Sequence, residues 1–87
     1  MKQGALKKEI TSLTMEILDT SWLDRVEKED IQSFGIKDAK RIILDYISNR
    51  EFRVAFEHLE YVISECNILL NKEQKEKILK LAAVLNT

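Results

Sequence analysis

The sequence contains no proline and only two glycines, Gly4 and Gly35, in 87 residues. A β-rich protein of this length needs many tight turns, and such turns are built mainly with glycine, proline and asparagine. A helical protein needs far fewer of them. The scarcity of both residues therefore argues against an all-β fold and favours helices before any periodicity is considered.

Cysteine and histidine are also scarce, with one of each, Cys66 and His58. A lone thiol cannot form the disulfide framework that small secreted domains usually require. On a helix the two side chains would lie roughly 12 Å apart, which is too far for both to bind one metal ion. With two glycines, neither a phosphate-cradling loop nor a dinucleotide fingerprint can be built. We therefore expect no catalytic residue, no metal ion and no cofactor, in a protein that is not an enzyme.

Long hydrophobic runs are absent as well. No apolar run approaches the ~20 residues of a membrane span, and the first residues contain no apolar stretch of signal-peptide length. We expect a cytoplasmic protein that does not bind membranes. The net charge is −1, from 14 basic and 15 acidic residues, and this lacks the basic excess that is usual in proteins that bind nucleic acids.

Apolar side chains do recur at helical spacing along most of the chain. The expected helices cover residues 5–19, 37–49 and 51–66 and the stretch from Asn71 to about Leu85, and residues 22–33 allow one or two short helical turns. Helices joined by a few residues pack antiparallel to their neighbours. We therefore predict a single all-α domain over 1–87, a compact antiparallel bundle of four helices with room for a fifth, short one.

Several residues are expected to mark the helix ends. Ser21-Trp22-Leu23-Asp24 looks like a weakened capping box, and Asn71 with Gln74 looks like a better one. Gly35 is expected at a left-handed C′ position that ends the piece 22–33. Two side chains are expected to pack around that corner, Phe34 and Ile36. The inward residues of the first and last helices are expected to be Leu6, Ile10, Leu13, Ile17, Ile78, Leu81, Ala82 and Leu85.

The helix over 51–66 has more than a simple two-sided pattern. Residues 51–71 carry one basic and four acidic side chains, the highest acidic excess per residue in the chain. A valine and a tyrosine, Val54 and Tyr61, fall opposite the core stripe. They indicate either a second packed side or a partner surface, because tyrosine is enriched at interfaces and carboxylates suit a basic partner. We predict four partner-binding residues here, Glu57, Glu60, Tyr61 and Glu65, although this strip could equally serve a homodimer.

Several features follow one another between residues 47 and 85. They are Ile47-Ser48-Asn49-Arg50-Glu51, Ala55-Phe56-Glu57-His58-Leu59, Glu65-Cys66-Asn67-Ile68 leading into Leu69-Leu70-Asn71-Lys72-Glu73, and the closing Ile78, Leu81-Ala82 and Leu85. In this order they resemble the MafI-type immunity proteins of bacterial polymorphic and contact-dependent toxin systems. The resemblance covers a little under half of the chain. It departs at Asn49-Arg50, where such proteins often place a glycine before the glutamate.

The resemblance implies a cytoplasmic protein that binds and neutralises a cognate toxin, often a nuclease. A nuclease active site is usually basic because it holds phosphates, so an acidic helix face could occupy or flank it. Two other classes of function stay open at this point. One is a regulatory adaptor without a toxin, and the other is a small DNA-binding regulator with a helix-turn-helix corner at Gly35. The sequence leaves a monomer and a homodimer equally open.

Overall fold

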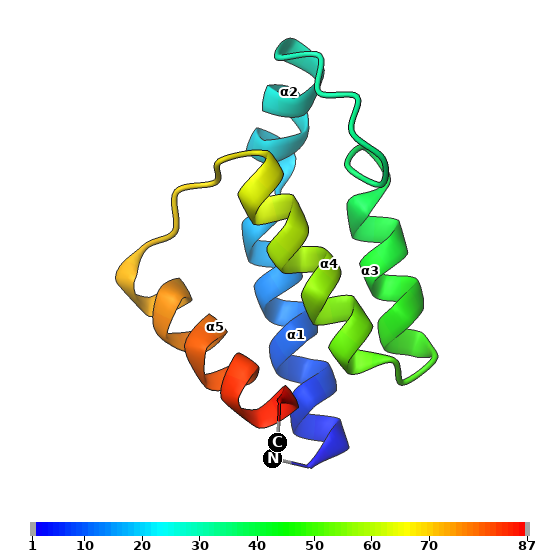
Figure 1. The fold of residues 1–87 in the computed structure, drawn as a ribbon, viewed down its shortest axis with the longest axis vertical. Coiled ribbons are helices and arrows are strands. Elements are labelled where there is room, and N and C mark those ends of the chain that lie inside the picture. Colours follow the sequence, from blue (N-terminus) through cyan, green and yellow to red (C-terminus); the bar gives the residue numbers. More distant parts are fainter. Residues whose placement is uncertain (1, 87) are drawn as a thin grey trace.

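The computed structural model describes residues 2–86, which fold into five α-helices joined by turns and loops (Figure 1). The helices are α1 (Gln3–Ile17), α2 (Thr20–Lys28), α3 (Ala39–Ser48), α4 (Phe52–Glu65) and α5 (Lys72–Leu85). Residues 2–86 contain no strand, so the predicted all-α bundle is confirmed, and α2 is its short fifth helix. None of these five helices has both the length and the apolar character that crossing a bilayer demands.

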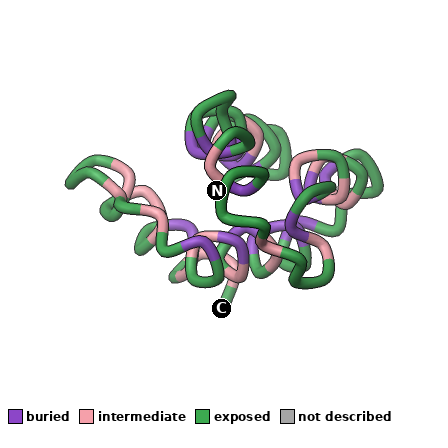
Figure 2. The backbone as a smooth tube through the Cα atoms, turned by 90° about the horizontal axis from the view of Figure 1, so that it is seen from above, coloured by how far each residue is buried: buried purple, intermediate pink, exposed green. Residues whose placement is uncertain are grey.

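The centre of the bundle is formed by α1, α3 and α4, which pack against one another. In Figure 1, α3 runs antiparallel to α1 and α4, and α5 descends beside α4 on the opposite side from α3. Seen from above, most buried positions face the space between the helices (Figure 2). The stripe predicted for the first helix is confirmed, because its four members are all buried: Leu6, Ile10, Leu13 and Ile17.

The last helix is attached by fewer apolar contacts. Leu81 is the one side chain of α5 that is buried, and the other residues predicted to face inward are only half-buried: Ile78, Ala82 and Leu85. Polar contacts hold the two ends of α5. The Gln74 amide donates to Glu16 Oε1 at 2.8 Å, and the Arg53 guanidinium donates to the Leu85 carbonyl at 2.5 and 3.1 Å.

The predicted capping box at the start of α5 is confirmed. The Asn71 side chain accepts from the Gln74 backbone N–H at 2.8 Å, and the Gln74 side chain accepts from the Asn71 N–H at 3.0 Å. The box predicted at Ser21 is wrong, because α2 begins one residue before Ser21. Asp19 is its N-cap, and the Asp19 carboxylate accepts from the Trp22 N–H at 3.0 Å. A carboxylate is favoured there by the positive end of the helix dipole.

Gly35 does not end α2, which corrects the prediction for that glycine. The helix ends at Lys28, and Asp30 takes the left-handed position with φ of 51°. The Ile31 N–H then bonds to the Val26 carbonyl at 3.2 Å, which is the closing bond of a Schellman motif. Gly35 is left-handed too, with φ of 74°, but it lies further along the loop 29–38.

The turn between α3 and α4 has the same geometry without a glycine. Arg50 has φ of 61°, and the Glu51 N–H bonds to the Tyr46 carbonyl at 2.9 Å. Arg50 therefore adopts the conformation that glycine adopts most easily. The α4–α5 connector repeats the motif at Asn67, with φ of 50°.

We expect Arg50→Gly to stabilise the protein by about 0.5–1 kcal/mol and to raise its Tm by about 2–8 °C. A Cβ destabilises the left-handed conformation, and the Arg50 side chain is exposed and makes no hydrogen bond or ion pair with residues 2–86. Thermal unfolding followed by circular dichroism measures the effect. Asn67→Gly is the matched control, and its gain should be smaller because asparagine tolerates this conformation better. An unchanged or lower Tm for Arg50→Gly would contradict this account of the turn.

Candidate partner-binding surface

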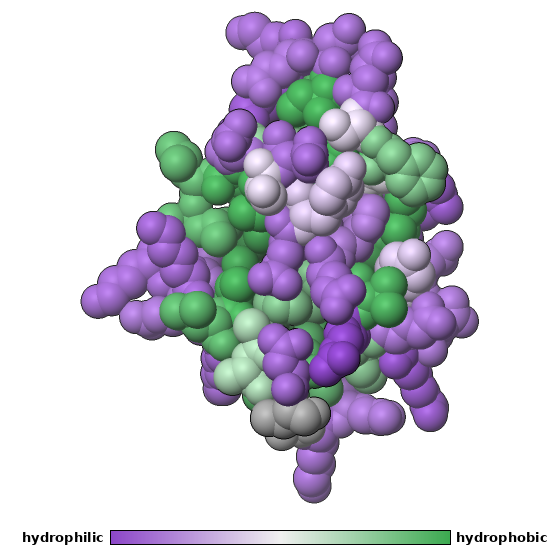
Figure 3. All heavy atoms as spheres, in the orientation of Figure 1, coloured by the Kyte–Doolittle hydropathy of each residue, from purple (hydrophilic) through white to green (hydrophobic). Residues whose placement is uncertain are grey.

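The outward side of α4 carries the four residues predicted to bind a partner. The helix buries Phe52, Ala55, Phe56, Leu59 and Val62. Because that stripe faces α1 and α3, the opposite side is left to solvent: Glu57, Glu60 and Glu65 are exposed and Tyr61 is half-buried. In Figure 3, mostly hydrophilic atoms cover α4 where it crosses the front of the molecule. The structure thus brings the predicted residues together on one side of one helix.

Two of these four residues also contact the loop between α2 and α3. The Tyr61 hydroxyl donates to the Phe34 carbonyl at 2.9 Å, and the Ser33 hydroxyl donates to Glu65 Oε2 at 3.2 Å. His58 Nε2 lies 2.9 Å from the Gly35 carbonyl. A carbonyl only accepts, so this ring nitrogen must carry the proton. Side chains of α4 therefore hold three successive loop residues.

The prediction that Phe34 packs around the corner at Gly35 is wrong. Its side chain is 90% exposed, whereas Ile36 is 0% exposed. The two side chains flank Gly35, whose left-handed backbone turns the chain between them, and only Ile36 is directed into the core. A Phe-Gly pair in a short connection was the only sequence signal of this arrangement. The result is an exposed aromatic ring on a loop in which the residues on either side, Ser33 and Gly35, are hydrogen-bonded to side chains of α4.

Gly35 lies directly against the His58 ring. A Cβ at this position would be 2.8 Å from His58 Cε1 and 3.1 Å from His58 Nε2. The His58 ring is in turn 5.5 Å from the Tyr61 ring, centroid to centroid. The loop can approach α4 this closely only because residue 35 has no side chain. We call Phe34 together with Glu57, Glu60, Tyr61 and Glu65 the α4–loop surface.

The carboxylates on this surface are not equivalent. Partial burial, and secondly the negative charge of Glu57, raise the pKa of the Glu60 carboxyl above its ordinary value. Both causes disfavour the ionised form. Because the pKa is higher in the folded state than in the unfolded state, Glu60 contributes stability below its unfolded pKa. That contribution is lost as the pH rises through the folded pKa.

We therefore expect Glu60→Gln to gain stability relative to the wild type as the pH rises from 3 to 7. The gain should stay below about 1 kcal/mol, since the side chain is largely exposed and its charge is screened by solvent. Urea unfolding at several pH values measures the difference. Glu73→Gln is the control, because Glu73 pairs with Lys77 at 3.4 Å and its removal should not stabilise. If the difference in unfolding free energy between Glu60→Gln and the wild type did not change with pH, the pKa of Glu60 would not be raised in the folded protein.

The two side chains considered for metal binding lie in structural positions. His58 bonds to the loop, and Cys66 is buried, while its carbonyl accepts from the Arg25 guanidinium. Within residues 2–86, no three histidine, cysteine, aspartate or glutamate side chains come together as a metal site requires. What the α4–loop surface offers is therefore an aromatic ring, a hydroxyl and three carboxylates.

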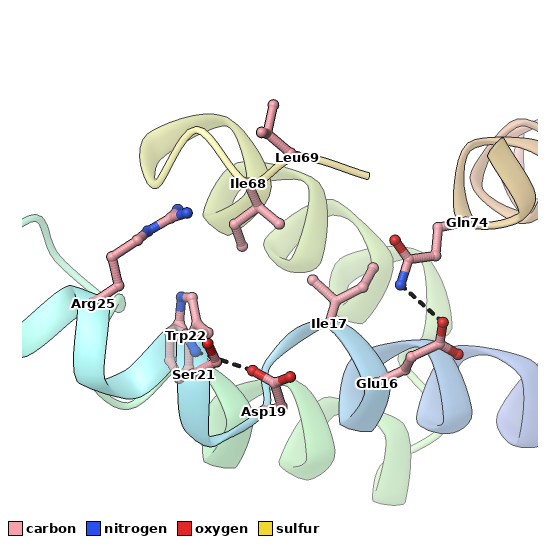
Figure 4. Close-up of a pocket in the computed structure, with 9 residues that line it drawn as sticks. All are labelled: Glu16, Ile17, Asp19, Ser21, Trp22, Arg25, Ile68, Leu69 and Gln74. Atoms are coloured by element: carbon pink, nitrogen blue, oxygen red, sulfur yellow. Dashed lines mark hydrogen bonds between the residues drawn. The ribbon is translucent and has the colours of Figure 1, made fainter. Parts of the chain in front are cut away.

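A hollow of about 270 Å³ lies where the connector 66–71 crosses the α1–α2 bend (Figure 4). Ile17 and Ile68 point into this hollow, and Leu69 points away from it and is 93% exposed. The walls are joined by the Gln74–Glu16 hydrogen bond and by the contact of Arg25 with the Cys66 carbonyl. These contacts attach the connector to the bundle, so we interpret the hollow as a gap between packed segments and not as a binding site.

No protein-family model matches this chain, and no curated protein or solved structure matches it either.

Proposed function

We propose that this protein is a non-catalytic, cytoplasmic immunity protein that binds a cognate bacterial toxin and neutralises it. The observation that carries the proposal is the α4–loop surface. There a loop bonded to α4 through Tyr61 and Glu65 presents a phenylalanine that is 90% exposed, and α4 itself presents three exposed carboxylates. A monomeric protein gains nothing in stability from exposing a large aromatic ring. Such rings are enriched at protein–protein interfaces, where they fill a pocket of the partner.

The way in which Phe34 is held supports a role in binding. Ordering a loop at an interface costs conformational entropy, and a loop ordered in advance avoids that cost. Tyr61 and His58 bond to the Phe34 and Gly35 carbonyls, and Glu65 accepts from the Ser33 hydroxyl, so the loop is held at and around Phe34 before any partner arrives. The ring is thus presented in a defined direction.

The charge of the surface suits a basic partner. Glu57, Glu60 and Glu65 lie on one side of α4, and a cation that approaches Glu60 would counter the repulsion from Glu57, the second cause of its raised pKa after partial burial. A nuclease must hold phosphates, so its active site offers the required positive charge. Opposite charges would also accelerate the encounter of the two proteins, most strongly at low salt.

Co-expression tests the proposal directly. The protein carries an affinity tag, and the product of the gene immediately upstream is examined for co-purification and for arrest of growth when it is expressed alone. We expect a stable complex, and we expect growth to be restored when both proteins are present. A harmless neighbour that does not bind would overturn the immunity function and would favour the regulatory adaptor.

Charge reversal tests whether the carboxylates take part. We expect Glu57→Lys with Glu60→Lys to weaken toxin binding by about 10–100-fold, mainly through a slower association that depends less on salt. Surface plasmon resonance at two salt concentrations measures both rates. The control is Glu73→Lys with Glu76→Lys on α5, which changes the net charge equally at exposed positions. Equal affinity for the two double variants would remove these carboxylates from the interface.

The DNA-binding alternative is disfavoured by the loop 29–38. A helix-turn-helix motif joins its helices by three or four residues, whereas ten residues separate α2 from α3. Gly35 lies in the middle of this loop against His58 and does not form a tight corner between the helices. A gel shift with mixed duplex DNA at low salt would restore that alternative if a complex appeared.

A further inference from the structure

A groove runs between the α1–α2 segment and α3, on the side of that pair that α4 does not cover. Its cavity volume is about 630 Å³, and none of the residues that line it belongs to α4 or α5. Its floor is apolar, since it contains Leu18 and Trp22, which are 1% and 6% exposed. Leu23 and Leu44 stand higher on the two walls, and Leu23 is 39% exposed. The groove therefore combines an apolar hollow with an apolar side chain that projects beside it.

The two walls of the groove differ in net charge: the α3 side carries three basic and two acidic side chains, and the opposite side carries one acidic side chain. On the α3 side, Arg41 is paired with Asp38 at 3.5 Å and with Asp45 at 4.0 Å. Lys37 and Lys40 lie on the same side, and within residues 2–86 neither ammonium has a carboxylate within 4 Å.

The opposite wall carries an acidic side chain, Asp19, whose exposed carboxylate caps α2. The charged side chains lining the groove are Lys37, Lys40, Arg41, Asp19, Asp38 and Asp45, and their charges sum to zero. A partner that is uniformly acidic or basic would match one wall and repel the other.

We propose that this groove binds the same groove of a second copy of the chain, forming a twofold homodimer. A twofold interface pairs one surface with itself, so the surface must be self-complementary. Here Lys37 and Lys40 on the α3 wall of one copy meet Asp19 on the α1–α2 wall of the other. Leu23 of each copy enters the hollow of its partner, beside Leu44 and above the indole of Trp22.

The dimer goes beyond the function proposed above and does not depend on it. No residue of the α4–loop surface lines the groove, so the dimer does not use the residues proposed to bind the toxin. Twelve residues line the groove, whereas a standard interface uses about 20–30 residues from each partner. The dimer should therefore be weak, with monomer prevailing at about 10 µM and dimer at about 1 mM.

Sedimentation equilibrium from 10 µM to 1 mM tests the proposal, with the protein alone as the probe. We expect the mass to rise from 10.2 kDa towards twice that value. Trp22, the one tryptophan of the sequence, should change its emission over the same range because it forms the groove floor. A mass that stays at 10.2 kDa up to 1 mM would overturn the dimer.

Two variants locate the interface. Leu23→Glu should raise the dimer dissociation constant at least tenfold, and Lys40→Glu should raise it severalfold by placing like charges opposite each other. Leu79→Glu is the matched control, since Leu79 is 70% exposed on α5, away from the groove. A dimer that survives Leu23→Glu, or one that is lost only in Leu79→Glu, would show that the contact lies elsewhere. Toxin binding should be unchanged in Leu23→Glu, so a failure of the dimer is distinguishable from a failure of the immunity function.

Discussion

Gly35→Ala should lower the free energy of unfolding by about 2–3 kcal/mol. Part of this loss, about 1 kcal/mol, comes from forcing a residue with a Cβ to a φ of 74°. The rest comes from contact, because the new Cβ would lie 2.8 Å from His58 Cε1 and the ring must move. Once the ring moves, its hydrogen bond to the Gly35 carbonyl is lost, which removes about 1 kcal/mol more. A chain of this size has roughly 4–9 kcal/mol in total, so the loss is large.

A double-mutant cycle with His58→Ala separates these two parts. In the His58→Ala background the ring is absent, so Gly35→Ala should cost only the backbone part, about 1 kcal/mol. Urea unfolding of the four proteins gives all the values needed. If Gly35→Ala costs the same in both backgrounds, the close contact with His58 makes no contribution. If it costs nothing, Gly35 is not held in the left-handed conformation.

Phe34→Ala should weaken binding of the toxin by about 30-fold or more, which corresponds to about 2 kcal/mol. The stability of the protein itself should change by less than about 0.5 kcal/mol, because 90% of the side chain is already exposed. Isothermal titration of the co-purified partner measures the affinity, and thermal unfolding checks the stability. The large loss is expected because an anchoring ring that is removed leaves its pocket on the partner unfilled.

The control for Phe34 is Leu69→Ala, which truncates a side chain that is 93% exposed on the connector outside the α4–loop surface. It should leave the affinity unchanged. Tyr61→Phe adds a further comparison, since it removes only the hydroxyl that donates to the Phe34 carbonyl. We expect it to speed dissociation by loosening the loop. If Phe34→Ala binds as well as the wild type does, Phe34 is not the anchor, although the carboxylates of α4 could still contact the toxin.

The functional assignment of Glu57, Glu60, Tyr61 and Glu65 stays a prediction, and the structure adds a second role for two of them. Tyr61 and Glu65 hold the loop through Phe34 and Ser33. Their substitution would therefore change the position of Phe34 as well as any direct contact. Glu57 and Glu60 have no such contact with the loop, which makes them the cleaner positions for charge reversal.

Local sequence was sufficient to predict α1, α3, α4 and α5, whereas for α2 it indicated only one or two short turns within residues 22–33. A period of 3.6 residues depends only on neighbours three and four positions away, so the buried stripe of α1 could be predicted from spacing alone. The Asn71–Gln74 capping box is also local, because its two hydrogen bonds join residues three apart. The absence of proline and the scarcity of glycine pointed to the same fold class, since helices need few turn residues.

The position of Phe34 was decided by tertiary structure. The hydrogen bonds that hold its loop join residues 23, 27 and 32 positions apart, and no local pattern contains them. The left-handed residues that end α2, α3 and α4 are aspartate, arginine and asparagine, and a search for glycine misses all three. The groove between the α1–α2 segment and α3 likewise exists only after packing. Spacing along the chain determines which side of a helix is apolar. The candidate site, in contrast, depends on which side chains, distant in sequence, are brought together when the helices pack.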